Sequence, residues 1–341
     1  MTEASQDSAA SQVSPASAAS RQAPARLDVV IVNWNSGALL ADCLDALGRS
    51  TIASALHVFV VDNASHDNSW RAAEGVRPLR VTLIRNADNR GFGAACNQAA
   101  FAGNAPYVLF LNPDTRVFPE TLEKALAFIT SPFQGGPPPG IAGVQLVDDS
   151  GEVQRTCANA PSAGRLLGRA LALDKVAPRL VTPHFMTDWD HRDTRPVAQV
   201  MGAFLLVERP LFQQLGGFDE RFFVYYEDLD LCLRAAAAGR TVAHDAGAQV
   251  WHQGQGTTAQ VKDRRLFYIW RSEVLFAAKH YGQAVAWSLL AAQLLAQTPL
   301  RVAQTLAQRR RSEWRQVLRG AGMLLGDLPT LAGKIRDAAR R

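Results

Sequence analysis

The sequence has few cysteines, and their spacing excludes the common uses of clustered thiols. Only four Cys occur among 341 residues, and no two of them form the C-x-x-C spacing of a zinc knuckle or a redox pair. We therefore expect the four cysteines to be buried, to behave as small hydrophobic residues and to lie in a reducing compartment. The four are Cys43, Cys96, Cys157 and Cys232.

Long apolar runs are also absent. No stretch reaches the roughly 18 apolar residues of a transmembrane helix, and the nearest approach, 284–296, is interrupted by Ser288 and Gln293. The first 26 residues are rich in Ala, Ser and Gln and lack the apolar segment of a secretory signal. We expect residues 1–26 to be a disordered leader and the protein to be cytoplasmic.

The composition itself is that of a folded protein. Hydrophobic residues make up 48% of the chain and charged residues 20%, which excludes a disordered chain, a collagen-like fibre and a disulfide scaffold. The length suits one large domain, or one domain with an appendage.

Positive charge is concentrated near the C-terminus. Residues 262–341 contain 15 Lys and Arg against 5 Asp and Glu, whereas the first 261 residues contain 21 against 26. A basic tail predicts an anionic partner. Its clustered Arg and Leu-rich faces are typical of helices on anionic lipid headgroups, and a helical cap with a solvated basic face would carry the same pattern. Nucleic acid is not expected, because the chain has no nucleic-acid motif and its acidic body would repel a polyanion.

Strands and helices alternate over the first 130 residues. Apolar runs predict strands at 27–33, 57–63, 81–86 and 107–114, and helical spacing predicts helices at 39–47, at 92–101 and from Pro119 onward. This alternation predicts an α/β fold with a mostly parallel central sheet flanked by helices.

The pattern is less regular after residue 130. It predicts a strand at 141–147, a variable insertion at 157–196, a strand at 197–209, a helix ending at Gly239, short strands within 241–252 and helices beyond 261. We expect one domain over residues 27–260 and a basic helical extension over residues 261–341.

Polar residues stand at the ends of three of the predicted strands, at the edge where open sheets bind ligands. The strand at 27–33 ends at Asn33, with Asn35 just beyond it, and the strand at 57–63 ends in Asp62 and Asn63. Asp62 could accept a hydrogen bond from a nucleobase, or cap a turn. The strand at 107–114 ends in a segment with Asn112 and Asp114, whose oxygens suit a hard divalent cation; an Asx turn capping the next helix is the alternative.

A glycine pair opens the helix predicted at 92–101. Gly91 and Gly93, between Asn89 and Asn97, permit close backbone approach to a phosphate or sugar. Cys96 stands where a dinucleotide fingerprint would have its third glycine, and a plain strand–helix turn is the alternative.

An acidic segment begins the helix that ends at Gly239. Glu227, Asp228 and Asp230 lie within four residues, after four aromatic residues. They are either ordinary N-terminal helix charge or a general base whose pKa is raised by apolar surroundings. His252 follows a short strand and precedes a Gly-rich turn; a lone His is more often structural than a ligand.

The order of these motifs along residues 27–281 strongly resembles the inverting glycosyltransferases of family 2, in the branch of bacterial rhamnosyl- and galactofuranosyltransferases. The motifs are VNWN, DNAS, NRGFGAACN, LNPD, GGFDERFFVYYEDLDLCLRA and WHQGQG. The resemblance implies a GT-A fold, a nucleoside diphosphate sugar donor and a divalent metal, Mg²⁺ or Mn²⁺.

The resemblance also implies a role for each site residue. Asp62 would read a uracil or thymine ring. Asp114 and His252 would hold the metal, although Asn112 stands where many members have a first Asp. Asp228 would be the catalytic base, and Glu227 its neighbour on the acceptor side. The implied donor site comprises Asn33, Asn35, Asp62, Asn63, Asn89, Gly91, Gly93, Asn97 and Asn112.

The implied activity is metal-assisted transfer of a sugar, with rhamnose favoured, by a single displacement that inverts its configuration. The donor would be a dTDP or UDP sugar, and the acceptor a glycan or lipid-linked hydroxyl in cell-surface polysaccharide synthesis. The basic tail would place the enzyme on the cytoplasmic face of the inner membrane. A galactofuranosyl- or N-acetylhexosaminyltransferase is the alternative within the fold, and a catalytically silent nucleotide- or glycan-binding scaffold is the alternative outside enzymes.

Overall fold

The computed structural model describes residues 26–76, 78–176, 183–254, 262–308 and 313–338. The leader predicted at 1–26 therefore lies, except for Arg26, outside the described residues. The strands are β1 Leu27–Asn33, β2 Leu56–Asp62, β3 Arg80–Arg85, β4 Tyr107–Leu111, β5 Thr115–Val117, β6 Ile141–Val147, β7 Arg195–Pro196, β8 Phe204–Glu208 and β9 Val242–His252.

The helices fall into two groups along the chain. Those before residue 240 are α1 Leu39–Gly48, η1 Ala53–Ala55, η2 Ser69–Ala73, α2 Phe92–Ala102, α3 Thr121–Thr130, α4 Ala163–Ala170, α5 Leu173–Val176, α6 Arg209–Gln214 and α7 Glu227–Ala237. Those after it are α8 Lys262–Tyr281, α9 Gln283–Ala292, the π-helical turn η4 Gln293–Gln297, α10 Thr298–Ala307, α11 Glu313–Gly326 and α12 Leu328–Ala338.

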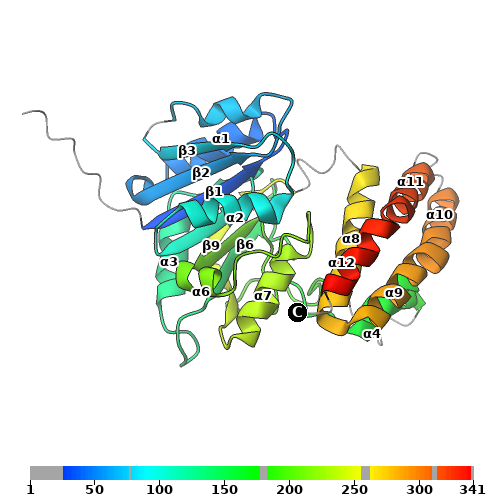
Figure 1. The fold of residues 1–341 in the computed structure, drawn as a ribbon. Coiled ribbons are helices and arrows are strands. Elements are labelled where there is room, and N and C mark those ends of the chain that lie inside the picture. The colour runs from blue at the N-terminus through cyan, green and yellow to red at the C-terminus, as the bar shows by residue number, and fades with distance from the viewer. Residues whose placement is uncertain (1–25, 77, 177–182, 255–261, 309–312, 339–341) are drawn as a thin grey trace, which may run out of the picture.

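A single nine-stranded sheet runs through the molecule in the order β3-β2-β1-β4-β8-β6-β9-β5, with β7 paired to β9 (Figure 1). The strands β3, β2, β1 and β4 are parallel, as the alternation predicts. Beyond β4 the sheet is mixed, because β8 runs antiparallel to both β4 and β6, and β6 is parallel to β9. The α/β fold with a central sheet flanked by helices is confirmed.

Both faces of this sheet are buried. Val29 and Ile31 of β1 pack with α1 and α3 on one face, and Val30 and Val32 pack with α2, α6 and α7 on the other. Burial of alternate side chains on both faces explains why these strands are continuous apolar runs. All four cysteines are buried and unpaired, as expected.

The second half of the sheet departs from the sequence prediction in two places. The strand predicted at 197–209 is longer than the observed strand β8, which begins at Phe204. The reason is that residues 201–204 form a turn in which Phe204 N–H donates to Met201 C=O. The short strands predicted at 241–252 form one strand, β9, whose pairing with β6 shifts register between Val144 and Gln145. Such a bulge breaks the apolar pattern without ending the strand.

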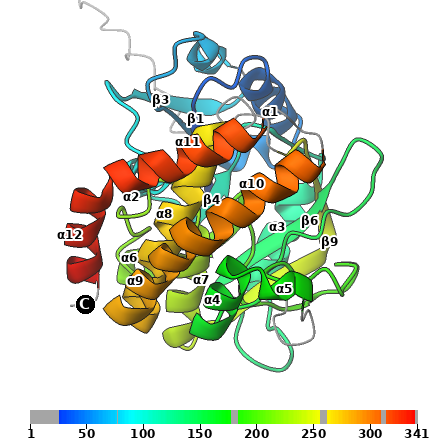
Figure 2. The ribbon, with the colours of Figure 1, turned by 90° about the vertical axis from the view of Figure 1, so that its right-hand side faces the viewer.

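Helices α8 to α12 pack beside the sheet, with α8 against α9, α11 and α12 (Figures 1 and 2). Their core is a separate hydrophobic cluster that also includes Leu166 of α4, Phe222 and Leu229. In its described residues, the region expected to be helical and basic is helical except at the short turns Gly282, Gln308 and Asp327. Among the described helices, none combines the length and the apolar character needed to cross a membrane.

Candidate functional site

The ends of β1 and β2 form a buried polar cluster. Asn33 lies opposite Asp62 in the parallel register, and its Nδ2 donates to Asp62 Oδ1 (2.9 Å), to Ser69 Oγ (2.9 Å) and to Ser65 Oγ (3.1 Å). Asn35 joins through its backbone N–H, which donates to Ser65 Oγ (3.0 Å). The structure therefore brings together three of the residues predicted at this sheet edge.

Asn63 shapes the loop that leads from β3 into α2. Its Nδ2 donates to Asn89 Oδ1 (2.9 Å) and to Gly91 C=O (3.1 Å). Its Oδ1 accepts from Asn86 Nδ2 and from Arg90 N–H, both at 3.1 Å. These four bonds occupy the amide, so Asn63 positions the loop; direct contact with a donor stays a prediction.

The Gly91–Gly93 turn packs against the segment that precedes α7. Phe92 N–H donates to Phe223 C=O (2.7 Å), and a Cβ on Gly91, which has φ +87°, would collide with the same oxygen. A Cβ on Gly93 would lie 3.2 Å from Phe218 Cβ. Glycine is needed at residue 91 for close approach of two backbone segments as well as for its positive φ.

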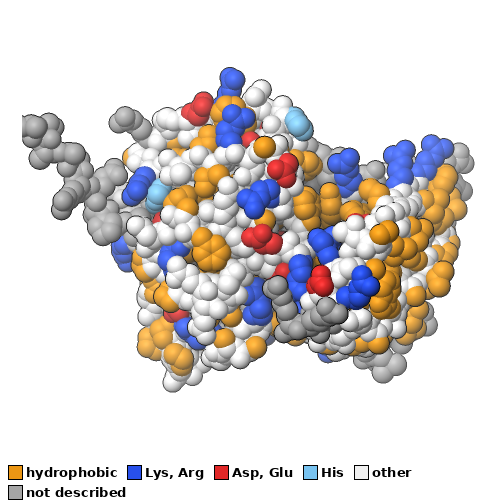
Figure 3. All heavy atoms as spheres, in the orientation of Figure 1, with side chains coloured by type: hydrophobic (Ala, Val, Ile, Leu, Met, Phe, Trp, Pro, Cys, Tyr) orange, Lys and Arg blue, Asp and Glu red, His pale blue; other side chains and the backbone are white. Residues whose placement is uncertain are grey.

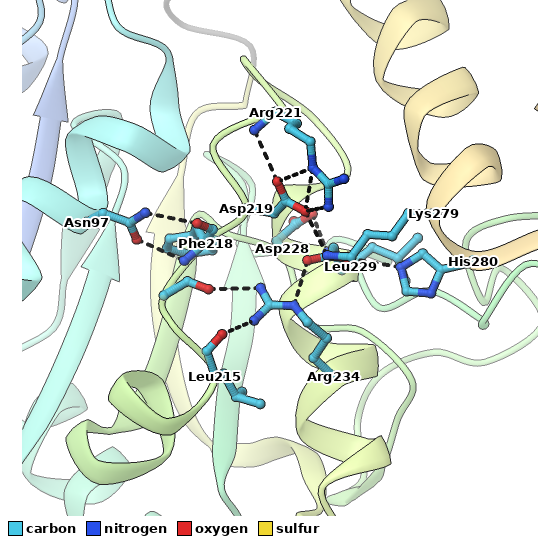
Figure 4. Close-up of polar contacts among 12 residues, drawn as sticks. Asn97, Leu215, Phe218, Asp219, Arg221, Asp228, Leu229, Arg234, Lys279 and His280 are labelled. Atoms are coloured by element: carbon cyan, nitrogen blue, oxygen red, sulfur yellow. Dashed lines mark hydrogen bonds and ion pairs between the residues drawn. The ribbon is translucent and has the colours of Figure 1, made fainter. Parts of the chain in front are cut away.

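Asn97 clamps α2 to the same segment (Figure 4). Its Nδ2 donates to Phe218 C=O (2.9 Å) and to Glu220 Oε1 (3.0 Å), while its Oδ1 accepts from Phe218 N–H (2.8 Å). The side chain is buried and fully used by these contacts. The structure therefore gives Asn97 a positioning role, and its contact with the donor stays a prediction.

Asp114 and His252 meet at the far end of the sheet, where β5 pairs with β9. His252 Nε2 lies 3.7 Å from Asp114 Oδ1, and both side chains are buried. His252 Nδ1 lies 2.9 Å from Gln154 Oε1, an acceptor that places the proton on Nδ1 and turns the Nε2 lone pair toward Asp114. Burial lowers the pKa of His252, and the Asp114 charge opposes that shift only in part.

This pair fits a divalent cation. A neutral imidazole whose other nitrogen donates to an amide oxygen is the usual form of a ligating His, and two metal–ligand bonds of about 2.1 Å span the observed separation. In the described part of the chain, no cluster of three or more Asp, Glu, His or Cys side chains suited to a metal occurs. The coordination sphere would have to be completed by a bound ligand and water.

Asp228 lies at the start of α7 and faces the end of β4 through two small residues. Its Oδ2 accepts from Gly202 N–H (3.0 Å) and its Oδ1 from Leu229 N–H (2.8 Å). The residue after Gly202, Ala203, accepts a hydrogen bond at its C=O from Asn112 N–H (3.0 Å). Gly202 and Ala203 thus connect Asp228 with the segment that carries Asp114. Burial raises the pKa of Asp228, and the Gly202, Leu229 and Gln199 hydrogen bonds oppose the shift.

Glu227 is buried against α2, with 5% of its surface exposed. No described residue donates a hydrogen bond to its Oε2. Burial, and next the Asp228 charge, raise the pKa of Glu227 well above its ordinary value. The two acids therefore differ in their surroundings, because Oε2 of Glu227 has no described hydrogen-bond donor while Asp228 has three donors that stabilise its charged form.

Asp230 does not belong to this site, although it follows two residues later. It is fully buried and pairs with Arg234 Nε (2.7 Å), Lys279 Nζ (2.6 Å) and His280 Nε2 (2.9 Å). Lys279 also pairs with Asp219 Oδ2 (2.8 Å), and this network joins α7 to α8 (Figure 4). These pairs lower the pKa of Asp230, although burial alone would raise it. Asp230 anchors the helix that carries Asp228.

The segment entering α7 is strained and is held by α8. Tyr225 and Tyr226 have φ of +69° and +71°, which non-glycine residues adopt at a cost of about 1–3 kcal/mol each. Tyr226 Oη donates to Glu273 Oε1 (3.0 Å), and Ser272 Oγ donates to Val224 C=O (2.8 Å). Contacts with α8 therefore help to maintain the backbone geometry that aims Glu227 and Asp228.

Several of these positioning residues are absent from the sequence prediction. The tertiary fold brings four such residues to the site from distant parts of the chain: Gln154, Gly202, Glu273 and Lys279. Of the four, Gly202 carries a sequence signal, because glycine inside a predicted strand marks a bulge or a close backbone approach.

Comparison with known proteins places this geometry in a family. The chain matches "Glycosyl transferase family 2" over residues 28–143 and "Glycosyl transferase family group 2" over residues 107–336. It is 30% identical over 307 residues to the N-acetylglucosaminyl-diphospho-decaprenol L-rhamnosyltransferase of Mycobacterium tuberculosis, covering 85% of this chain and 97% of that protein.

Solved structures support the same fold. One is S. aureus TarS 1–349 in complex with UDP-GlcNAc, with a TM-score of 0.53 at 15% identity, covering 92% of this chain and 89% of that one. Another is the mannosyltransferase PcManGT from Pyrobaculum calidifontis in complex with GDP-Man and Mn²⁺, with a TM-score of 0.51 at 18% identity and 90% coverage of each chain. The chain therefore belongs to glycosyl transferase family 2 and is a glycosyltransferase.

Proposed function

We propose that the protein transfers L-rhamnose from dTDP-L-rhamnose to N-acetylglucosaminyl diphosphate carried on a polyprenol. The likeness to the mycobacterial rhamnosyltransferase carries this proposal, because it extends over 97% of that protein and so includes regions beyond the donor-binding half. A UDP sugar is the other donor that a carboxylate such as Asp62 would suit, since uracil and thymine share the same imide N–H.

The proposed roles follow from the geometry of the described residues. Asp62, kept in place by Asn33, would accept the imide N–H of the base. Asp114 and His252 would hold a divalent cation, and such a cation neutralises negative charge on a leaving diphosphate. Asp228 would remove the proton from the acceptor hydroxyl during attack on the anomeric carbon. Glu227, the neighbour of Asp228 with a raised pKa, would form a hydrogen bond with the acceptor sugar.

One displacement without a covalent sugar–enzyme intermediate would invert the anomeric configuration. A transfer assay with radiolabelled dTDP-L-rhamnose and a synthetic GlcNAc-diphosphoprenol should give a disaccharide product whose rhamnosyl linkage, read by NMR, is opposite in configuration to the donor. UDP-galactofuranose and UDP-GlcNAc, offered in parallel, should give no product. Transfer from either UDP sugar but not from dTDP-L-rhamnose would contradict the proposed donor.

We also propose that the C-terminal helices contact an anionic membrane surface. Trp287, Leu295, Leu300 and Leu306 are exposed on α9, η4 and α10. Hydrophobic atoms line the outer edge of these helices, and Lys or Arg side chains gather above them (Figure 3). Apolar exposure beside basic groups suits headgroups together with the upper acyl region.

Vesicle co-sedimentation measures this contact. The protein should sediment with vesicles that contain anionic phospholipid, less with purely zwitterionic vesicles, and less as salt rises, because surface attraction is screened. Replacing Leu295, which is 80% exposed, with Gln should weaken binding without changing the melting temperature. Equal binding to both kinds of vesicle at all salt concentrations would contradict an electrostatic contribution.

A further inference from the structure

A cavity of about 230 Å³ lies between the α4–α5 segment and the η4–α10 segment, away from the residues assigned to the donor. Arg169, Asp174, Gln297, Leu300 and Arg301 are among its lining residues. The volume is below the roughly 300–1,000 Å³ of pockets that hold drug-sized ligands. It therefore suits a small group, such as one or two phosphates, better than a whole sugar nucleotide.

Arg301 has no hydrogen-bond acceptor among the described residues. It makes no hydrogen bond or ion pair with any residue in the described part of the chain; it lies over the Trp270 ring, 5.9 Å from the centroid, and the charges of Glu273 and Asp174 act on it from farther away. Desolvation lowers the pKa of Arg301, and these two charges oppose that shift. Gln297 Oε1, on the same wall, is shielded from solvent and has no described donor, but as an acceptor it cannot be satisfied by a phosphate oxygen. The guanidinium of Arg301 is thus the group whose missing partners an anionic ligand could supply.

A second guanidinium lines the cavity from α4. Arg169 Nη2 forms an ion pair with Glu273 Oε1 at 4.0 Å. The two oxygens of Glu273 also accept hydrogen bonds from Tyr226 Oη (3.0 Å) and Gln293 Nε2 (2.9 Å). The lining contains two guanidinium groups, Arg169 and Arg301, and the carboxylate of Asp174; Glu273, outside the lining, is a second carboxylate that acts on both. Paired guanidinium groups with planar donors are well suited to phosphate oxygens.

The cavity is connected to the catalytic acids by a short path. Glu273 Oε1 is shared between Tyr226, the residue before Glu227, and the side of the cavity formed by Arg169. A group in the cavity would therefore lie near the acceptor side of the site, rather than beyond the strands that carry Asp62 and Asp114.

Exposed leucines occur on both segments that form the cavity. Leu300 belongs to the lining itself, and α10 crosses the face turned toward the viewer in Figure 2, with α4 and α5 beside it. The other exposed leucines of these segments are Leu171 and Leu173 in α4–α5 and Leu295 and Leu306 in η4–α10, and the five together are called the leucine rim. Guanidinium groups in a cavity whose walls carry exposed leucines match a ligand that joins a phosphate to a hydrocarbon chain.

We propose that this cavity binds the diphosphate of a prenyl-linked acceptor, with the prenyl chain lying on the leucine rim. The inference rests on the proposed function for the identity of the acceptor and deepens it, because it assigns a separate subsite to the part of the acceptor that does not react. Binding of the diphosphate and the prenyl chain at this subsite would position the acceptor sugar beside Asp228.

Direct binding of geranyl diphosphate tests the subsite without any transfer reaction. The titration is done calorimetrically in EDTA, so that the donor site has no divalent cation, with inorganic pyrophosphate and geraniol as the two partial ligands. Wild type should bind geranyl diphosphate, and Arg301→Gln should weaken that binding about tenfold or more, since a charge-assisted contact is lost. Arg49→Gln, at an exposed arginine that follows the last residue of α1, is the control and should bind as wild type does.

The outcomes separate the subsite from the proposed function. If pyrophosphate binds as tightly as geranyl diphosphate, the cavity takes a free phosphate; if geraniol binds as tightly, the cavity recognises only the chain. Either result would overturn the proposal. Unchanged affinity for geranyl diphosphate in Arg301→Gln would overturn it as well. In the transfer assay, Arg301→Gln should raise KM for the prenyl-linked acceptor and leave KM for the donor unchanged. Absence of transfer by wild type that binds geranyl diphosphate would count against the proposed function alone.

Discussion

Replacing Asp228 with asparagine should lower kcat by about a thousandfold or more, while nucleotide binding stays as in wild type. Asparagine preserves the shape of the side chain and keeps one acceptor oxygen, for either Gly202 N–H or Leu229 N–H, but it cannot take a proton from the acceptor hydroxyl. General-base catalysis contributes about 10²–10⁴-fold. Steady-state kinetics together with calorimetric nucleotide binding measure the two effects separately.

The pH profile of the wild type gives a second measure of the same residue. Asp228 must be deprotonated to act as base, so kcat/KM should be maximal above its pKa and fall as the pH drops through it. Because burial raises that pKa, the fall should begin at a higher pH than for an ordinary aspartate. Asp42→Asn, which neutralises an exposed carboxylate on α1, should leave both kcat and the profile unchanged. A kcat in Asp228→Asn within tenfold of wild type would exclude Asp228 as the base.

Replacing Asp114 with alanine should abolish the metal dependence of nucleotide binding and lower kcat/KM by about a hundredfold or more. The substitution removes the carboxylate from the Asp114–His252 pair and leaves the imidazole alone, and one neutral nitrogen is a poor site for a hard cation. Calorimetric titration with UDP and dTDP, with and without Mn²⁺, measures the change. Wild type should bind one of the two nucleotides more tightly when Mn²⁺ is present, and the variant should bind it equally weakly in both conditions.

Two further variants make this result specific. Asp42→Ala should keep the Mn²⁺ dependence of wild type, since its carboxylate is exposed on α1. His252→Asn should weaken the dependence without unfolding the protein, because the amide is smaller and leaves the Asp114 carboxylate in place. Undiminished Mn²⁺-dependent binding in a folded Asp114→Ala protein would rule out the assignment of Asp114 as a metal ligand.

The first half of the fold and the locations of the motifs were predictable from local pattern. The β1 strand and α2 helix begin where predicted, at Leu27 and Phe92, because apolar runs and helical spacing are strong signals when both faces of a sheet are buried. Asn33 and Asp62 were predicted at one sheet edge, and the parallel register places them opposite each other. Parallel strands necessarily bring their carboxyl ends to the same edge.

Other parts of the site depend on contacts between residues far apart in the chain. Gly202 holds Asp228 and Gln154 orients His252 across separations of 26 and 98 residues, and neither separation has a periodic signature. The contrast among Glu227, Asp228 and Asp230 is of the same kind. The three acids lie within four residues, yet one is buried without a donor to Oε2, one accepts backbone hydrogen bonds and one is in an ion-pair network.

The sequence by itself thus determined the residue types, their order and the family they belong to, because those properties are written in local spacing. Only the tertiary structure decided which acid is in an ion-pair network, which is buried without a donor to one oxygen and which accepts backbone hydrogen bonds, and only it brought Arg169 and Arg301 to one cavity. The physical reason is that burial and charge pairing set a side chain's chemistry, and both depend on neighbours that the fold supplies from elsewhere in the chain.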